Sequence, residues 1–266
     1  MVLGEIIQQR SKGESKMKKS VNIFIATHKS FDFPYPSCYI PLHVGAAGKK
    51  DLGYQKDNTK DNISSKNSSF CELTGMYWIW KNSISDIVGL VHYRRYFFYK
   101  QNGMYILLTE EKIKDTMLNY DVIVPKKVKF ITHDVKNQYK AHHHIEDYEI
   151  CADIIKELYP DYVDSFNEVS KRKWLYAYNM CILSKKNYDK YCKWLFDILF
   201  ELEKRVSIDE YDNYNKRIFG FLSERLFNVW LNKNSNLKIK EFDVYNVDQN
   251  LNKQIIFNGI KDIIVR

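Results

Sequence analysis

The sequence feature that most constrains the fold is a five-residue apolar run, Ile87–Val91, that ends abruptly in polar chemistry. Its aliphatic and mostly branched side chains are typical of a strand that is buried on both faces. His92, Arg94 and Arg95 follow at once, with aromatic residues between and after them. In α/β sheets, ligands bind beyond the carboxyl ends of the strands. The sequence therefore predicts a buried strand whose end carries anion-binding groups.

Short apolar runs of this kind recur along the chain and alternate with segments of helical period. We expect strands over the ranges Val21–Ala26, Tyr39–Val44, Val88–Val91, Asp121–Pro125, Tyr178–Leu183 and Lys238–Val247. We expect helices over the ranges Phe70–Asn82, Thr109–Asn119, Asp147–Leu158, Lys186–Lys204 and Phe219–Trp230. Because strands and helices alternate, the pattern predicts an α/β fold with a mostly parallel sheet flanked by helices on both faces.

No linker divides this pattern, so we expect a single domain over residues 17–266. Residues 1–16 are polar and lack the apolar segment of a secretory signal, and we expect them to be a disordered extension. The five cysteines are scattered and odd in number, which favours a reducing compartment. With no apolar run of about 18 residues, the sequence predicts a cytoplasmic protein that is at most peripheral to a membrane.

The net charge of +8 suits nucleic acid, an anionic membrane surface or a phosphate-bearing substrate. The lysines and arginines are dispersed, and a dedicated nucleic-acid binder would show a denser basic arm or a known module. We therefore rank nucleic acid last among these partners. The 20 tyrosines, 15 phenylalanines and 5 tryptophans can fill a large core and still leave rings for a ligand.

A second polar group follows the first expected strand. Thr27, His28 and Lys29 stand where the nucleotide-facing turn of many α/β folds lies. We interpret them as donor-binding residues that contact a base, ribose or phosphate. The alternative is an ordinary turn between a strand and a loop with an exposed lysine.

The segment between residues 45 and 69 is poor in hydrophobic residues and long for a loop without function. Asp61, Asn62, Lys66 and Asn67 offer the carboxylate and amide groups that sugar hydroxyls need, and Glu72 follows in the first turn of the next helix. We interpret these five residues as donor-binding. The alternative is a solvated loop in which Asn67 or Ser68 caps the next helix and Glu72 complements its dipole.

At this point the motifs themselves resemble a known family. The matching stretches are Ile25–Lys29, His43–Ala46, Asp61–Asn67, Cys71–Asn82, Val88–Phe97, Tyr178–Met180 and Arg217–Leu226. Together they resemble the bacterial capsular or exopolysaccharide biosynthesis glycosyltransferases, formerly a domain of unknown function, which include galactofuranosyl and galactosyl transferases. The resemblance covers roughly residues 19 to 247. It implies a GT-A-like, Rossmann-related fold and transfer of a hexosyl group from a nucleotide sugar.

Many GT-A enzymes carry an Asp-x-Asp motif after a central strand, where it holds a divalent cation on the donor diphosphate. Here the corresponding positions are His92, Tyr93 and Arg94. Arginine binds phosphate bidentately, so we interpret His92, Arg94 and Arg95 as catalytic groups that replace part or all of the metal's role. A manganese or magnesium ion remains possible, and no metal ligand is assigned. The alternative is that these cations pair with helix carboxylates.

Glu224 is the candidate catalytic base, because an inverting transferase needs a carboxylate to take the proton of the acceptor hydroxyl. It lies in a largely apolar helical segment, where a carboxylate is unfavourable unless it has a partner or a function. Asp61 and Glu72 compete for the same role. The alternative for Glu224 is a salt bridge to Arg225 or Arg217.

On the acceptor side we place Asn179, Met180 and one histidine of the run 142–144, for which we choose His142. Adjacent residues of one element point apart, so the three histidines do not make a metal site by themselves. The aromatic side chains of Tyr77, Trp78 and Trp80 are expected in the core rather than in a sugar platform.

The sequence and the resemblance together predict a glycosyltransferase that uses a UDP-sugar, with galactofuranose or galactose favoured, and a saccharide or lipid-linked acceptor of surface polysaccharide synthesis. Direct displacement with inversion is the expected mechanism. A membrane surface is a possible further partner, touched by exposed aromatics of the segments 186–204 and 219–230. The alternative function is a non-catalytic nucleotide- or carbohydrate-binding protein with a decayed transferase fold.

Overall fold

The computed structural model describes residues 19–248. The expected N-terminal extension, residues 1–16, and both ends of the expected domain 17–266 lie outside these described residues. The strands are β1 Val21–Thr27, β2 Tyr39–His43, β3 Gln55–Lys56, β4 Ile87–His92, β5 Arg95–Gln101, β6 Met104–Leu107, β7 Val122–Pro125, β8 Val128–Lys129, β9 Trp174–Leu175, β10 Cys181–Ser184 and β11 Ile239–Asn246. The α-helices are α2 Asn67–Phe70, α3 Leu73–Asn82, α4 Glu110–Thr116, α5 Val135–His142, α6 Ile145–Leu158, α7 Val163–Ser170, α8 Lys185–Arg205 and α9 Ile218–Lys233. Short 3-10 helices cover Ser64–Lys66, Pro160–Tyr162 and Asn215–Arg217.

The main sheet is mixed, so the prediction of a mostly parallel sheet is wrong. Within the described residues it has nine strands in the order β3-β2-β1-β4-β10-β7-β11-β5-β6. The neighbours of β1 are parallel to it, as are the pairs β2–β3 and β7–β11. Strand β10 instead runs antiparallel to both β4 and β7, and β5 runs antiparallel to both β11 and β6. The part of the sheet from β3 to β4 is thus parallel, and the part from β10 to β6 is mixed.

Two hairpins account for the antiparallel pairings of β5 with β4 and β6, whereas β10 enters the sheet after the helices α5, α6 and α7. The chain turns back after β4, and His92 pairs with Arg95 at the start of β5. It turns back again at Asn102 and Gly103, both with positive φ, between β5 and β6. Asn-Gly is the residue pair that favours a two-residue hairpin turn, and this signal would have revealed β5 and β6, two of the strands that were not predicted. Because β5 meets β4 as well as β11, the strands β4, β10, β7, β11 and β5 form a closed circuit.

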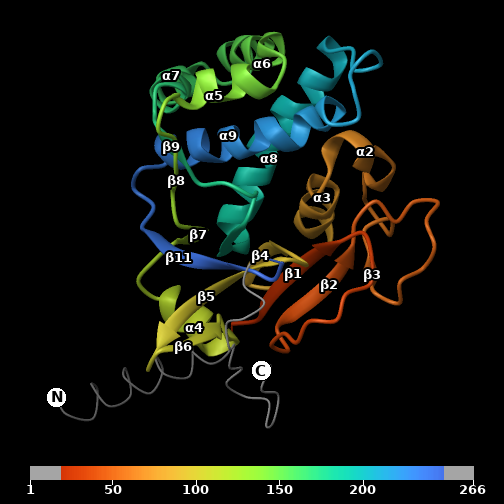
Figure 1. Ribbon diagram of the computed structural model, residues 1–266, viewed down its shortest axis with the longest axis vertical. Helices are drawn as coiled ribbons and strands as arrows, with labels where there is room; N and C mark the ends of the chain where they lie inside the picture. The colour runs from red at the N-terminus through yellow and green to blue at the C-terminus, as the bar shows by residue number, and fades with distance from the viewer. Residues whose placement is uncertain (1–18, 249–266) are drawn as a thin grey trace, which may run out of the picture.

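The core lies on both faces of the sheet, as the two-residue period of β1 requires. Phe24 and Ala26 join the core cluster beneath α3, α8 and α9, whereas Ile23 and Ile25 join the cluster on the opposite face. Figure 1 shows that α5, α6 and α7 form a further layer above α8 and α9, while α4 lies with β5 and β6 on the other side. Helices cover both faces, as expected, but unequally.

Gly89 allows the sheet to close around β4. A Cβ atom at this position would lie 2.7 Å from Ile182 Cγ1, 2.9 Å from the Cys181 carbonyl oxygen and 3.0 Å from Ile23 Cδ1. Only a glycine permits this approach of the flanking strands. The close contact positions the carboxyl end of β4, and therefore the residues that follow it.

A buried carboxylate organises the segment after β2. Asp57 is fully buried and accepts hydrogen bonds from the backbone N–H groups of Gly45 and Ala46, at 2.8 and 3.0 Å. The hydroxyls of Ser64 and Thr74 donate to the same carboxylate. These bonds join the end of β2, the long loop and α3, so this loop is a fixed part of the fold.

We expect Asp57→Asn to lower the free energy of unfolding by about 3 kcal/mol, because the new amide N–H₂ group faces buried donors. Urea denaturation measures the change. The matched control is Asp51→Asn, which removes an exposed pair with Lys56 and should cost less than about 1 kcal/mol. Equal losses in the two variants would contradict the proposed role of Asp57.

Candidate active site

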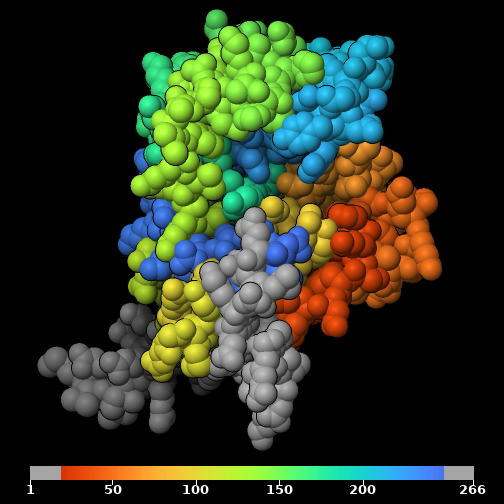
Figure 2. All heavy atoms as spheres, viewed as in Figure 1, coloured from red at the N-terminus to blue at the C-terminus, as the bar shows by residue number. Residues whose placement is uncertain are grey.

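A cleft of about 580 Å³ lies at the carboxyl ends of β1 and β4. Its other walls come from the α2–α3 region, the loop before β10 and the start of α9. Figure 2 shows the surface hollowed between the light-blue and green helical segments and the red and yellow ends of the strands. The lining residues are Ala26, Thr27, His28, Val44, Asn67, Ser68, Cys71, Glu72, His92, Tyr93, Arg94, Arg95, Tyr178, Arg217 and Glu224.

The turn between β4 and β5 carries the predicted His92, Arg94 and Arg95 into this cleft. The exposed Arg94 bonds Asp248 through Nη1 at 2.9 Å, and the Arg95 guanidinium lies 4.8 Å from the centre of the Tyr178 ring. The backbone N–H of Tyr93 donates to the Ala26 carbonyl, which fixes the turn against β1. Arg94 thus pairs with a carboxylate outside the helices, whereas His92 and Arg95 lie near the carboxylates of Glu72 and Glu224, as the alternative proposed.

His92 is held by the loop before β10. Its Nε2 lies 2.6 Å from the Tyr178 carbonyl oxygen, which can only accept, so Nε2 carries the proton. Burial lowers the pKa of His92, although the nearby Glu72 carboxylate opposes that shift. His92 is therefore neutral near pH 7, and it orients the loop rather than adding a positive charge.

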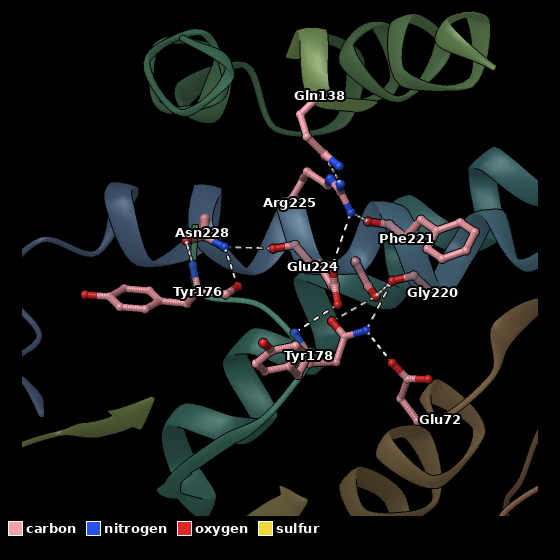
Figure 3. A network of polar contacts seen from close by, with 11 residues as sticks. Glu72, Gln138, Tyr176, Tyr178, Gly220, Phe221, Glu224, Arg225 and Asn228 are labelled. Carbon is pink, nitrogen blue, oxygen red and sulfur yellow. Dashed lines mark hydrogen bonds and ion pairs between the residues drawn. The ribbon is translucent and has the colours of Figure 1, made fainter. Parts of the chain in front are cut away.

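Figure 3 shows Tyr178 in a polar network with Glu224, and the next residue, Asn179, extends this network to Glu72. Tyr178 and Asn179 both have positive φ, 75° and 51°, a conformation that costs energy for residues other than glycine. The Tyr178 N–H donates to Glu224 Oε1 at 2.9 Å. Asn179 Nδ2 donates to Glu72 Oε1 at 2.7 Å and to the Gly220 carbonyl at 3.1 Å. One strained dipeptide thus holds both carboxylates of the cleft.

Glu224 lies on α9 with its carboxylate toward the cleft. Burial raises its pKa, although the neighbouring Arg225 opposes that shift. Arg225 Nη1 lies 3.2 Å from Glu224 Oε2, so the salt bridge considered as an alternative does exist. Arg225 is itself buried and also bonds Gln138 and the Phe221 carbonyl. The ion pair and a place in the cleft are therefore compatible for Glu224.

Arg217, Cys71, Ser68 and Tyr178 line the cleft but were not predicted as site residues. Arg217 Nε donates to Cys71 Sγ at 3.2 Å. Burial raises the pKa of the Cys71 thiol to about 11, so it is a neutral partner and not a thiolate. The position of Arg217 just before α9 was visible in the sequence, but no periodic signal points it across to Cys71.

The predicted donor residues divide into two groups. Thr27, His28, Asn67 and Glu72 line the cleft. Partial desolvation in the cleft lowers the pKa of His28, as do the nearby charges of Lys29 and Arg94. The Thr27 hydroxyl donates to the Lys29 carbonyl at 2.6 Å, and Asn67 Nδ2 donates to the Cys71 carbonyl at 2.7 Å. Thr27 thus stabilises a local turn, as its alternative proposed, whereas Asn67 bonds a carbonyl and is not the N-terminal cap of α2 or α3.

Lys29, Asp61, Asn62 and Lys66 are not among the residues that line the cleft. Lys29 Nζ lies over the Tyr93 ring, at 5.2 Å from its centre. Asp61 accepts a hydrogen bond from the Tyr77 hydroxyl, and Asn62 bonds the Lys60 carbonyl. Lys66 Nζ forms an ion pair with Glu203 at 2.6 Å. Asp61, Asn62 and Lys66 are thus engaged by α3, by their own loop and by α8, whereas Lys29 lies over a ring that lines the cleft.

The predicted acceptor residues lie apart from one another. Met180 is fully buried in the core beneath the sheet, so its side chain cannot contact an acceptor. Asn179 is buried behind the cleft, where it positions Glu72. His142 is exposed and does not line the cleft. The expected core position of the aromatic residues on α3 is correct for Trp78, which is buried, and for Trp80, which stacks on Phe196.

His143 is the histidine of its run that packs toward the site. Its ring stacks on Phe221 with centres 4.1 Å apart and on Tyr214 at 5.5 Å. Its Nδ1 lies 3.1 Å from Asn215 Oδ1. Burial lowers the pKa of His143 to about 4, and the hydrogen bond to Asn215 opposes that shift.

A protein-built metal site does not fit this cleft. Across residues 19–248, no group of three or more His, Cys, Asp or Glu side chains could hold a metal ion. Glu72 Oε1 and both oxygens of Glu224 already accept hydrogen bonds or ion pairs from the protein. We derive no step through a metal bound by these residues.

The described helices are too short or too polar to cross a membrane. The aromatic residues that were expected to be exposed on α8 and α9 are instead mostly buried, and contact with a membrane stays a prediction. Trp194, Phe196, Phe219 and Trp230 are all buried in the core. Both helices were predicted correctly, but α6 covers α8 and α7 covers α9.

The fold and the cleft define an α/β protein with basic groups and two carboxylates at the carboxyl ends of parallel strands. The chain belongs to the family described as Domain of unknown function (DUF4422), which matches residues 22–235. No curated protein matches it. The apo structure of the bifunctional glycosyltransferase WbbM is similar over 92% of this chain, with 32% sequence identity and a TM-score of 0.80. The chain spans about half of that protein, 47% of its length.

The lowered pKa of His143 predicts a specific pH dependence of stability. The unfolded histidine titrates near 6.5 and the folded one at about 4. Between these values only the unfolded chain binds the proton, so stability falls as the pH falls from about 6.5 to about 4. We expect His143→Phe, which keeps a stacked ring, to reduce the difference in Tm between pH 7 and pH 4.5 by about 2–4 °C, after allowance for solvent screening of this half-buried group.

Differential scanning calorimetry measures this difference. The matched control is His142→Phe, which changes the exposed neighbour and should leave the difference in Tm as it is in the native protein. An unchanged pH dependence in His143→Phe would show that the stack does not exclude the proton.

Proposed function

We propose that this chain is a glycosyltransferase that moves a hexosyl group from a UDP-sugar to a saccharide acceptor in the synthesis of a surface polysaccharide. Galactofuranose and galactose are the favoured sugars. The observation that carries the proposal is the cleft itself, in which Arg94, Arg95 and Arg217 accompany Glu72 and Glu224. The similarity to the bifunctional glycosyltransferase WbbM over 92% of the chain supports it.

The cationic side of the cleft suits the donor diphosphate. Planar guanidinium groups bind phosphate oxygens through paired N–H donors and keep their charge at all relevant pH values. Arg94 and Arg95 reach the cleft from the β4–β5 turn, and Arg217 reaches it from the start of α9. Cations on two sides of a diphosphate stabilise the charge that develops as it leaves. The neutral His92 keeps the turn in place through Tyr178.

Glu224 is the catalytic base in this proposal. The acceptor hydroxyl oxygen attacks the anomeric carbon, the bond from that carbon to the diphosphate oxygen breaks, and the hydroxyl proton passes to the Glu224 carboxylate. UDP leaves with the bonding electron pair, and the configuration of the sugar inverts. A base is most effective when its pKa approaches the working pH, and burial raises the pKa of Glu224. The Tyr178 N–H fixes one carboxylate oxygen at 2.9 Å.

The acceptor in this proposal is a saccharide, either free or linked to a lipid diphosphate. The positive net charge of the chain suits a lipid diphosphate and anionic headgroups at the inner face of a membrane. In this proposal the enzyme is peripheral to the membrane. No helix among the described residues is long and apolar enough to span it.

We expect Glu224→Gln to lower kcat for transfer by about 10²–10⁴-fold, because the amide cannot take the acceptor proton. Release of UDP from UDP-galactose and UDP-galactofuranose measures the rate. The Tm reports whether the variant folds. The matched control is Glu241→Gln, a carboxylate of β11 that pairs with Lys127 and does not line the cleft; it should retain the native rate.

Near-native transfer by a folded Glu224→Gln protein would assign the base to another residue. Tight UDP binding by the native protein with no release of UDP from any donor would favour the alternative of a non-catalytic nucleotide-binding protein.

We also expect UDP release to persist in excess chelator within about twofold, because protein cations carry the role that a divalent ion has in other GT-A enzymes. The same assay, run with chelator and then with added manganese or magnesium, measures this. A complete loss of activity that manganese restores would show that a cation assists Arg94 and Arg95 at the diphosphate.

A further inference from the structure

A group of stacked rings lies at the rim of the cleft and has no part in the proposed chemistry. It consists of His143 at the junction of α5 and α6, Tyr214 before α9, and Phe221 on α9. The ring centres are 4.1 Å apart for His143 and Phe221, 5.5 Å for His143 and Tyr214, and 4.9 Å for Tyr214 and Phe221. We call these three residues the rim stack.

The rim stack adjoins the cleft through Arg217. This arginine lines the cleft, and its guanidinium lies 5.4 Å from the centre of the Phe221 ring. Its backbone N–H also donates to the Tyr214 carbonyl at 3.2 Å. Tyr214 and Arg217 thus belong to one turn of chain, and a ligand that leaves the cleft past Arg217 meets the rings next.

Tyr214 is unusual because it is held firmly and yet exposed. The residue is 52% exposed, whereas most large hydrophobic side chains of the described residues are buried. The Asp212 carboxylate accepts hydrogen bonds from the backbone N–H groups of Tyr214 and Asn215, at 2.8 and 2.7 Å. Asn215 in turn contacts His143. A ring that only anchored the loop would be covered, but this one presents much of its surface to solvent.

The chemistry around Tyr214 suits a sugar. The C–H face of a hexose packs on an aromatic ring, while its hydroxyls need planar polar groups at the edge. The exposed Asp212 carboxylate and the Asn215 amide lie within three residues of the ring. A fixed ring also loses little conformational entropy when a ligand binds.

We infer that the rim stack is an acceptor subsite, in which Tyr214 packs against a sugar ring of the acceptor saccharide beyond the residue that receives the hexosyl group. This inference rests on the proposed function, since it places the acceptor on the side of the cleft formed by α9. Glu224 lies on the same helix, ten residues after Tyr214 in the sequence. The acceptor hydroxyl would thus approach the base from the rim stack, opposite the turn that carries Arg94 and Arg95.

Saturation-transfer nuclear magnetic resonance with galactose, methyl β-galactofuranoside and lactose at millimolar concentration tests the subsite, because it detects sugar protons in contact with protein rings. We expect Tyr214→Ala to weaken binding of the saccharide that binds the native protein by about five- to tenfold. Tyr214→Phe keeps the ring and should bind within about twofold. The matched control is Tyr120→Ala, a partly exposed tyrosine at the amino end of β7 that should bind as the native protein does.

UDP affinity is measured by calorimetry on the same samples. Native-like saccharide binding by Tyr214→Ala, or no binding of any of the three saccharides to the native protein, would overturn the subsite. Persistent UDP binding in either case leaves the donor half of the proposed function intact. Saccharide binding that depends on Tyr214, without UDP binding by the native protein, would instead support the subsite and contradict the transferase.

Discussion

The site depends on one strained dipeptide, Tyr178–Asn179, in left-handed backbone conformation. Its peptide groups and the Asn179 amide reach Glu224, Glu72, His92 and the Gly220 carbonyl, which belong to three different parts of the fold. A conformation that costs energy persists only when its surroundings fix it. Here the surroundings are the two carboxylates and the histidine themselves. The strain and the geometry of the cleft therefore maintain each other, and neither α9 nor β4 can shift without disturbing both.

The sequence predicted the half of the site that local rules govern. The end of a buried strand marked His92, Arg94 and Arg95, and an acid within an apolar helix marked Glu224. Both inferences need only an apolar segment of regular period and a polar residue that interrupts or ends it. The prediction failed for Lys66 and Met180. An ion pair with α8 directs the Lys66 side chain, and the core cluster that contains Ile23 and Ile25 holds the Met180 side chain. Those contacts join residues distant in sequence, and no local pattern encodes them.

The prediction of the fold was limited in the same way. The strands that were predicted from apolar runs lie within a few residues of their observed positions, because burial fixes them. Strand directions did not follow, because direction depends on how the chain returns to the sheet. The turn at Tyr93 and Arg94 was interpreted as a ligand-binding rim, and it is also the reversal that begins β5. A ligand-binding turn and a hairpin turn use similar residues, so the interpretation as a ligand-binding rim hid the reversal of the chain.

The position of β10 has a consequence for how the molecule is made. This strand lies between β4 and β7, so the sheet stays open at its middle until residues 181–184 arrive. His92 meets its carbonyl partner 86 residues later in the chain, and Glu72 meets its amide partner 107 residues later. Contacts of such separation form late and slowly. During synthesis, the earlier strands and the aromatic surfaces of α3 therefore stay exposed until the final third of the domain emerges. Aggregation competes with folding during this interval.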